Sequence, residues 1–290
     1  MLKHHILVTG ANGQTGKELR DLARIYDGHT YTFLSKEDLP IENYELVRNF
    51  FDIKKPTALI NCAAYTAVDK AETEKNLAFQ VNGESVGVLA AVCRAHGARF
   101  IHISTDYVFD GLSSIPYRET DATSPINVYG ASKLFGEQEA MRHNPDSVIL
   151  RTSWVYSAYG RNFVKTMMKL MGERKEVNVV SDQLGSPTYA ADLAEALLSV
   201  ALASRIFPGI YHFSNEGVVS WYEFALAIAE ISGSGCMVRP IPASAFPTPA
   251  QRPGYSVLDK SLICSTYGIT IKPWKTSLDA CIRQIRAEGD

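Results

Sequence analysis

The sequence has 290 residues, enough to bury a large core in one α/β domain or in one domain with a smaller lobe. Its hydrophobic fraction of 46% and charged fraction of 21% are those of a folded globular protein. Acidic residues number 31 and basic residues 29, so no strong field exists to attract phosphate backbones or anionic lipid. We therefore expect neither nucleic acid nor a membrane as a partner.

The cysteines and the apolar runs bear on the compartment. No two cysteines form a C-x-x-C pair, which argues against a disulfide framework and a zinc site. The first apolar stretch is about five residues long, too short for a secretory signal, and no run approaches the roughly twenty residues of a membrane span. We expect a cytoplasmic protein with reduced thiols, and both a monomer and a homodimer remain open.

Apolar runs of strand length alternate with segments of helical period along the first two thirds of the chain. Strands are expected at residues 6–8, 31–34, 57–61, 99–103 and 147–151, and helices up to about residue 26 and over 44–51, 70–96 and 129–142. This alternation predicts an α/β fold with one doubly wound parallel sheet of the Rossmann kind.

The last third of the chain has a different character. Five prolines fall between Pro240 and Pro253, and no run of apolar strands is expected to continue there. We predict an NAD(P)-binding Rossmann domain over residues 1–154 plus about 176–206. A smaller C-terminal substrate lobe is predicted over about 155–175 and 207–290, with an amphipathic helix at about 221–231. The proline-rich segment is either a surface loop or a binding element.

A glycine motif, G-x-x-G-x-x-G, lies between the first strand and the first helix. It comprises Gly10, Gly13 and Gly16, with Asn12 inside the turn. Such a turn lets a dinucleotide pyrophosphate approach the helix N–H groups and the positive end of the helix dipole. A purely structural glycine turn is the alternative.

The residues after the second strand bear on the choice of cofactor. Many NAD-binding proteins place an acid there to accept a hydrogen bond from the ribose, whereas this chain has Ser35 and Lys36. A hydroxyl and a cation tolerate a 2′-phosphate better than an acid does. The pair therefore favours NADPH, with NADH possible, although ordinary loop polarity explains the same residues.

Tyr129 and Lys133 are four residues apart, which on a helix brings them to one face. A phenol titrates near pH 10, so a nearby ammonium is expected to lower its pKa and make it an acid–base catalyst. A solvated helix face is the alternative reading. Ser104 and Thr105 lie at the carboxyl end of the fourth strand, and strand alternation allows only one of them to be catalytic. His102, mid-strand, is expected to be a packed core histidine.

With these features the sequence resembles the extended short-chain dehydrogenases, and within them the dTDP-4-dehydrorhamnose reductases, over nearly the whole chain. The matching blocks, in order, are NCAAYTAVDKAE (61–72), STDYVFDG (104–111), PINVYG (125–130), RTSWVY (151–156), NFVKTM (162–167), DQLGSPT (182–188) and PTPAQRP (247–253). Seven blocks in the same order are hard to obtain by chance.

The resemblance implies roles for individual residues. Thr105 would be the catalytic hydroxyl, Tyr129 the proton donor, and Lys133 the group that tunes the tyrosine and holds the nicotinamide ribose. Residues implied along the cofactor are Gln14, Thr15, Ala63, Ala64 and Tyr65. Residues implied around the sugar are Thr66, Val68, Asp106, Tyr107, Trp154 and Arg252. For Trp154, packing at the domain junction is the alternative.

The implied reaction is reduction of the 4-keto group of dTDP-4-dehydro-L-rhamnose to dTDP-L-rhamnose, a precursor of cell-surface polysaccharide. Two alternatives remain: another nucleotide-linked 4-keto-6-deoxy sugar, or a non-catalytic nucleotide-binding regulatory subunit. The chain departs from the family pattern at Ser35 and at Leu39-Pro40-Ile41, near the expected adenosine. Glu18 fits one position of a magnesium-bridged dimer contact, but Ala191 stands where a second acid would be. No metal site is predicted.

Overall fold

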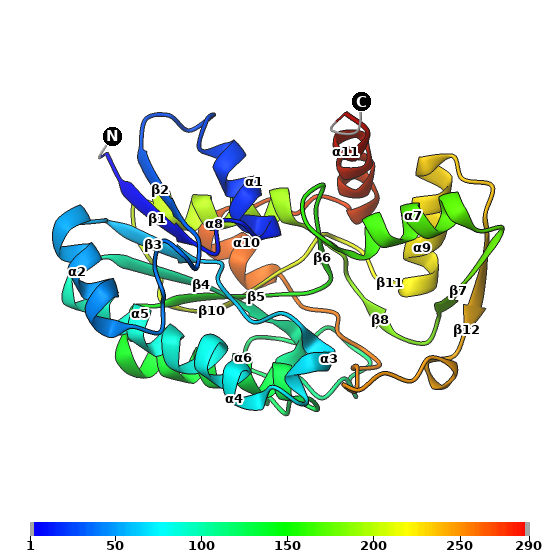
Figure 1. Cartoon of the computed structure of the whole chain (residues 1–290), viewed down its shortest axis with the longest axis horizontal. Helices are drawn as coiled ribbons and strands as arrows, with labels where there is room; N and C mark the ends of the chain where they lie inside the picture. The colour runs from blue at the N-terminus through cyan, green and yellow to red at the C-terminus, as the bar shows by residue number, and fades with distance from the viewer. Residues whose placement is uncertain (1–2, 288–290) are drawn as a thin grey trace.

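A computed structural model of the chain describes residues 3–287, and its centre is a parallel β-sheet (Figure 1). Over these residues the sheet has six strands in the order β10-β5-β4-β3-β1-β2, all paired in parallel. The strands are β1 (His5–Thr9), β2 (Thr30–Leu34), β3 (Ala58–Asn61), β4 (Arg99–Thr105), β5 (Val148–Thr152) and β10 (Gly209–Phe213). The predicted doubly wound α/β fold is confirmed. The order in which strands are added to the sheet reverses between β1 and β3, and ligands of such sheets bind at this switch point.

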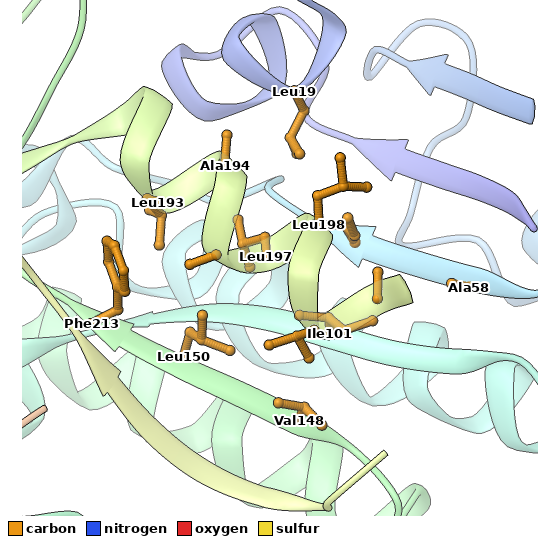
Figure 2. Close-up of a cluster of buried hydrophobic side chains, with 14 of the residues drawn as sticks. Leu19, Ala58, Ile101, Val148, Leu150, Leu193, Ala194, Leu197, Leu198 and Phe213 are labelled. Atoms are coloured by element: carbon orange, nitrogen blue, oxygen red, sulfur yellow. The ribbon is translucent and has the colours of Figure 1, made fainter. Parts of the chain in front are cut away.

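Helices cover both faces of the sheet, which explains why strands such as β1 and β3 are buried over successive residues rather than on alternate ones. α1 (Gln14–Leu22) and α8 (Ala190–Leu202) lie on one face; α2 (Tyr44–Lys54), α5 (Ser85–Ala95) and α6 (Val128–His143) lie on the other. Figure 2 shows Leu193 and Leu197 of α8 directed at Ile101 and Leu150 of the sheet. Leu19 of α1 belongs to the same buried cluster, so the helix that follows the glycine turn is anchored on the core.

The single helix predicted over 70–96 is wrong, because the chain is broken there into several pieces. They are α3 (Val68–Ala71), α4 (Lys75–Phe79), a π-helical turn η1 (Gln80–Glu84) and α5. The π turn holds Asn82, whose carbonyl lies so close to Gly136 of α6 that a Cβ there would be 2.0 Å from it. Apolar periodicity does not report such a close approach between helices, and π turns of this kind are frequent at functional sites.

A second hydrophobic core lies beside the sheet and forms the lobe (Figure 1). Its elements are α7 (Phe163–Glu173), β7 (Glu176–Val180), α9 (Trp221–Ser232), β12 (Met237–Ile241) and α11 (Trp274–Ala287). α9 begins as the sequence predicts and has a capping box, in which Ser220 Oγ accepts from the N–H of Glu223 and the Glu223 carboxylate accepts from the N–H of Ser220. Phe224 of this helix is fully buried in the lobe core.

Two of the expected domain boundaries need correction. Residues 209–213, placed in the lobe by the sequence, form the edge strand β10 of the main sheet beside β5. Residues 176–180, placed in the Rossmann domain, pair with β12 in the lobe. Both errors concern short segments whose partner strand lies about 60 residues away along the chain, and local composition does not report that pairing.

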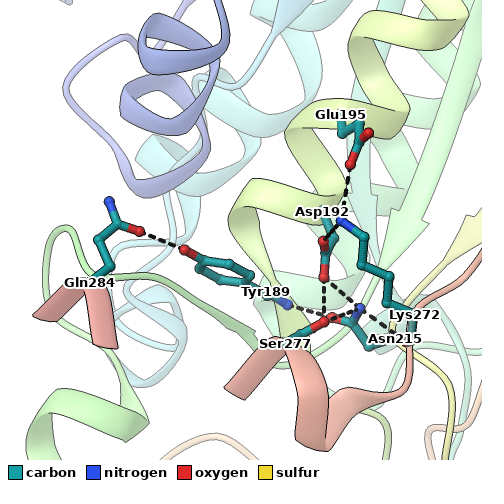
Figure 3. A network of polar contacts seen from close by, with 7 residues as sticks. All are labelled: Tyr189, Asp192, Glu195, Asn215, Lys272, Ser277 and Gln284. Atoms are coloured by element: carbon teal, nitrogen blue, oxygen red, sulfur yellow. Dashed lines mark hydrogen bonds and ion pairs between the residues drawn. The ribbon is translucent and has the colours of Figure 1, made fainter. Parts of the chain in front are cut away.

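Short elements join the two parts. β6 (Val155–Tyr156) pairs with β9 (Thr188–Tyr189), β8 (Leu184–Gly185) pairs with β11 (Val219–Ser220), and α10 (Ser261–Tyr267) packs under the main sheet. Figure 3 shows a polar network that fixes α11 to α8. Asp192 accepts hydrogen bonds from Asn215, Ser277 and Lys272, at 2.7, 2.5 and 2.8 Å. Tyr189 donates to Gln284 of α11.

The structure also bears on the cysteines and on membrane insertion. All five cysteines are free thiols, and burial raises the pKa of Cys62 to about 12. Among residues 3–287, none of the helices is both long enough and apolar enough to cross a bilayer.

Candidate active site

The glycine turn has the geometry that a phosphate cradle needs. Gly10 has a φ of +65°, and a Cβ there would lie 2.6 Å from backbone atoms of Cys62 and Ala63. A Cβ on Gly16 would lie 2.5 Å from the carbonyl oxygen of Gly10. Gly13 caps α1 without any side-chain hydrogen bond, so the first N–H groups of the helix have no side-chain acceptor. The turn therefore presents backbone donors and the positive helix end to one place.

Two asparagines hold the predicted cofactor strip at residues 63–65. Asn61 Oδ1 accepts from the N–H of Ala63 at 3.1 Å. Asn82 Oδ1 accepts from the N–H of Tyr65 at 2.8 Å, and Asn82 Nδ2 donates to the Tyr65 carbonyl at 3.0 Å. Asn82 also donates to Ser132 of α6 at 2.9 Å, which ties the strip to the predicted catalytic helix. The sequence reading did not assign either side chain, although a polar residue in a buried strand or helix was a usable signal.

Ser35 and Lys36 follow β2 directly, beside the glycine turn. The N–H of Ala11 in that turn donates to the carbonyl of Leu34, the last residue of β2. The N–H of Ser35 donates to Asp38 Oδ2 at 2.9 Å, so an acid that the sequence reading did not assign lies at the same strand end. Lys36 is exposed. A hydroxyl, a cation and a carboxylate thus surround the place where the adenosine ribose is expected.

Thr105 and Tyr129 are brought together, as predicted. Thr105 ends β4 and Tyr129 lies in the first turn of α6, and hydrogen bonding to Thr105 lowers the pKa of the phenol. Burial and the nearby Asp106 outweigh this and raise the pKa of Tyr129 to about 12. The expectation of a lowered tyrosine pKa is therefore not met in this structure. The cause is desolvation of the phenolate.

Lys133 lies under the strands rather than on the helix surface. Its Nζ donates to the carbonyl of Ile103 at 2.6 Å and lies 3.3 Å from Nε2 of His102. The residue is 2% exposed, and burial lowers its pKa to about 8, with Glu137 and Cys62 opposing that shift. The solvated-face alternative is excluded. Its ammonium is close to its titration point at neutral pH, which suits a group that exchanges protons.

Ser104 and Thr105 have different partners, as strand alternation predicts. Ser104 Oγ donates to Glu137 Oε1 at 2.5 Å, deep against α6. Thr105 Oγ1 donates to Asp106 Oδ1 at 3.0 Å and accepts from the N–H of Tyr107. Burial raises the pKa of Asp106 to about 7, against hydrogen bonds from Ser256 and Thr105 that lower it. Only Thr105 is close to the phenol, so the hydroxyl chosen by the family resemblance is also the one that the geometry favours.

Three of the residues expected around the sugar, Asp106, Tyr107 and Arg252, lie close to Tyr129 or to one another. The ring of Tyr107 meets that of Tyr129 edge to face, with centroids 5.8 Å apart. Burial raises the pKa of Tyr107, with smaller contributions from Asp106 and, in the opposite direction, Arg252. Arg252 forms a two-pronged ion pair with Asp69 of α3, with two N–O distances of 3.0 Å. Val68 begins the same short helix, and exposed Thr66 accepts its N–H.

The contact between Arg252 and Asp69 holds the end of the proline-rich segment in place. Besides the ion pair, the N–H of Ala250 donates to Asp69 Oδ1 at 3.2 Å. Pro253 packs against Gly111, where an added Cβ would lie 2.4 Å from the proline side chain. The end of this segment is therefore pinned beside the predicted sugar site and is not a free surface loop.

Trp154 lies at the junction with the lobe. Its ring stacks on Trp221 of α9 with centroids 3.5 Å apart, and Gly185 leaves the space its indole occupies. Its φ of +49° is in the left-handed region, which non-glycine residues rarely adopt. Such strain persists only where the surroundings hold it, and it clusters at functional sites. Trp154 therefore packs at the domain junction, as the alternative interpretation had it. Contact between Trp154 and a ligand stays a prediction.

The loop after β6 packs on the start of α1. Asn162 donates to Gln14 Oε1 at 2.9 Å, and Ser157 donates to Glu18 at 2.5 Å. Glu18 is 4% exposed. Within residues 3–287, His, Cys, Asp and Glu side chains form no group of three that could hold a metal ion.

Comparison with known proteins shows the family to which the chain belongs. The model of the family described as RmlD substrate binding domain matches residues 4–287. The curated dTDP-4-dehydrorhamnose reductase of Burkholderia thailandensis is 42% identical over 299 residues, covering 98% of this chain and 99% of that protein. The crystal structure of a dTDP-4-dehydrorhamnose reductase from Clostridium acetobutylicum superposes with a TM-score of 0.93 at 41% identity, covering 97% and 99% of the two chains.

A further solved structure bears on the cofactor. The dTDP-4-dehydrorhamnose reductase of Bacillus anthracis in complex with NADP has a TM-score of 0.93 at 38% identity, covering 98% of this chain and 100% of that one. A UDP-glucose 4-epimerase of Thermus thermophilus in complex with NAD, at 22% identity and a TM-score of 0.82, shares the fold alone. The chain belongs to the RmlD substrate binding domain family, the family of the dTDP-4-dehydrorhamnose reductases.

Proposed function

We propose that this chain reduces the 4-keto group of dTDP-4-dehydro-L-rhamnose to the alcohol of dTDP-L-rhamnose, with NADPH as the preferred donor. The observation that carries the proposal is the meeting of Thr105 with Tyr129 at the carboxyl end of β4, with Lys133 one helical turn further. This group lies on the same sheet edge as the glycine turn between β1 and α1. A hydride donor held by the turn and a sugar held near Arg252 would meet between them.

The chemistry divides between the cofactor and the protein. The nicotinamide, when bound, supplies the hydride. Tyr129 then gives its hydroxyl proton to the developing alkoxide, and Thr105 hydrogen-bonds the same oxygen. General acid help of this kind is worth typically 10² to 10⁴ in rate, and orientation of the two reactants adds to it. Lys133 holds the ribose and supplies the positive charge that favours the phenolate after proton loss.

The remaining roles follow the two parts of the fold. The Rossmann part would hold the dinucleotide through residues 10–16, 35–36 and 63–65. The sugar would be held by Asp106 and Tyr107, which follow β4, by Trp154 at the junction and by Arg252 of the lobe. The nucleotide sugar is a small soluble substrate, so the enzyme would act in the cytoplasm, as a monomer or homodimer, without nucleic acid. Size-exclusion chromatography with light scattering separates the two assemblies.

A coupled assay tests the function. The chain is mixed with fresh dTDP-4-keto-6-deoxyglucose and its 3,5-epimerase, and the absorbance of NADPH or NADH is followed. Consumption only when the epimerase is present supports the proposal. Consumption without the epimerase would instead point to another 4-keto-6-deoxy sugar. No consumption with either cofactor, despite cofactor binding measured by calorimetry, would indicate the non-catalytic regulatory subunit.

A further inference from the structure

A buried line of hydrogen bonds crosses three strands and ends at Lys133. It begins at Thr9, whose Oγ1 donates to Asn61 Oδ1 at 2.6 Å. Asn61 Nδ2 faces Nδ1 of His102 at 2.9 Å, and His102 Nε2 faces Lys133 Nζ at 3.3 Å. The side chains are 2% exposed or less. None of the roles given above uses this line, although it touches the proposed catalytic lysine directly.

The line assigns one tautomer to His102. Asn61 Oδ1 already accepts from the Thr9 hydroxyl and from the N–H of Ala63, so the amide oxygen is turned away from the imidazole. The Asn61 amide must then donate to His102 Nδ1, and Nδ1 must be the unprotonated nitrogen. Burial and the neighbouring Lys133 hold the pKa of His102 well below its usual range, so the ring is neutral. Its proton is on Nε2.

An Nε2–H group directed at the Lys133 nitrogen favours the neutral form of that lysine over its charged form. An ammonium group has donors only, so Nε2–H and the Lys133 ammonium oppose each other across 3.3 Å. A neutral amine has a lone pair that accepts from Nε2–H. We propose that His102, held in its Nε2–H form by Thr9 and Asn61, is a positioning residue that favours the neutral amine of Lys133 and so makes its ammonium a ready proton source.

Two other groups around Lys133 favour its charged form. Glu137, one turn further along α6, and Cys62, at the end of β3, both raise the pKa of the ammonium. Glu137 is itself paired with Arg151 of β5. Tyr129 shares the helix face of Lys133. Among these neighbours, His102 is the group with a hydrogen-bond donor facing the amine.

The inference rests on the proposed roles of Tyr129 and Lys133 and completes their proton balance. In the reduction, the Tyr129 O–H bond breaks and the sugar O–H bond forms. The phenolate must regain a proton, so an N–H bond of the Lys133 ammonium breaks and the Tyr129 O–H bond forms again. The resulting amine accepts from His102 Nε2–H until solvent reprotonates it. Without that partner the amine would be buried with an unpaired lone pair.

The first test is the pH profile of kcat/KM in wild type and His102→Phe, which keeps the ring volume. Wild type should lose rate as the pH rises through about 8, as the Lys133 ammonium is lost. In His102→Phe the opposing N–H is absent, so this midpoint should move upward by about one pH unit, a tenfold change in acidity. A lower kcat with an unchanged midpoint, or a midpoint shifted downward, would overturn the inference.

The second test does not depend on turnover. NMR of the cofactor-free protein with ¹³Cε-labelled lysine follows the titration of Lys133, assigned by its absence in Lys133→Met, and ¹⁵N imidazole spectra report the tautomer of His102. We expect a single Nε2–H tautomer in wild type. Asn61→Asp presents a second acceptor oxygen, so it should move the His102 proton to Nδ1. An Nδ1–H tautomer in the wild type would refute the inference.

The two tests separate this inference from the proposed catalytic roles. If Lys133→Met keeps the alkaline limb of the rate profile, Lys133 is not the group that titrates in catalysis, and the proposed role fails. The NMR midpoint of Lys133 in His102→Phe still decides whether His102 acts on it. Thr9→Val serves as a third variant, distant from Lys133, if His102→Phe does not fold. Because the N–H of Ala63 still holds the Asn61 oxygen in this variant, the Nε2–H tautomer of His102 should persist, and an Nδ1–H tautomer there would count against the inference.

Discussion

Arg151 of β5 holds Glu137 of α6 in a buried, two-pronged ion pair, with N–O distances of 2.8 and 2.6 Å. Both side chains are 3% exposed. Ser104 of β4 donates to the same carboxylate, so the pair joins two strands to the helix that carries Tyr129 and Lys133. The ion pair therefore connects the stability of the fold with the placement of the catalytic helix.

Removing one partner of this pair should be far more harmful than removing both. Arg151→Met leaves the Glu137 carboxylate buried without its counter-charge, which typically costs about 3–5 kcal/mol. The double variant Glu137→Leu with Arg151→Met should recover much of that loss, because no unpaired charge remains. Urea unfolding of the two single variants and the double variant measures this. Equal destabilisation by single and double changes would show that packing, and not charge, dominates.

Tyr129→Phe should keep the fold and the cofactor affinity while losing about 10² to 10⁴ in kcat. The phenol hydroxyl supplies the proton, whereas the glycine turn that binds the phosphates is unchanged. Steady-state rates with the epimerase-coupled substrate and calorimetry with NADPH measure the two effects. Tyr107→Phe is the matched control, since its ring meets Tyr129 edge to face, and it should affect KM more than kcat. Turnover near the wild-type rate in Tyr129→Phe would remove the residue from its role.

The three glycines of the cradle should respond differently to alanine. At Gly16 a Cβ would lie 2.5 Å from a backbone oxygen, and at Gly10 the φ of +65° adds strain, so both variants should be severely destabilised. At Gly13 the Cβ would lie 3.2 Å from the Gly10 carbonyl, which a small shift relieves. Gly13→Ala should therefore fold with a near-normal melting temperature and bind NADPH about tenfold or more weakly.

Gly28→Ala provides the control for that series, because nothing lies within 4 Å of its added Cβ. It should match wild type in both melting temperature and cofactor affinity. Full cofactor affinity in Gly13→Ala would mean that the phosphates do not approach this part of the turn.

Asp106 should make stability depend on pH. Its folded pKa is about 7 against an ordinary value of 3.8, mainly because of burial. Between these values the folded state keeps a proton that the unfolded state has released, so unfolding free energy falls as pH rises, by at most about 1.4 kcal/mol per pH unit. Above pH 7 the effect levels off. Denaturant unfolding at pH 5, 6, 7 and 8 should show this slope in wild type and a flatter one in Asp106→Asn. Parallel curves for the two proteins would contradict the raised pKa.

The elements of the first half were largely predictable because their signals are local. The glycine turn, the strand ends and the Tyr129–Lys133 spacing depend on residues a few positions apart, and all lie where the sequence predicted. The long helix over 70–96 was wrong because the chain there forms α3, α4, a π turn and α5, and the π turn meets Gly136 of α6 only in the folded chain. Strand β10 was missed for the same reason, since its partner β5 lies far away in sequence.

The ionisation of the site residues also depends on the folded structure more than on sequence spacing. Sequence spacing correctly placed a phenol and an ammonium on one helix face, but it did not anticipate that burial raises the pKa of Tyr129 to about 12 and lowers that of Lys133 to about 8. It also took His102 for simple packing, whereas both of its ring nitrogens face polar partners. Solvation depends on which side chains surround a group from other elements, and that is a property of the packed chain.

The amino-acid sequence alone therefore determined the doubly wound fold and the glycine turn, because these follow from local backbone preferences and short-range spacing. The family was indicated separately, by the seven blocks that resemble it. Tertiary structure decided which strands pair in the main sheet and which pair in the lobe, how Asp69 binds Arg252, and which polar groups surround His102. Those outcomes depend on desolvation and on contacts between residues distant in the chain, and no single segment contains them.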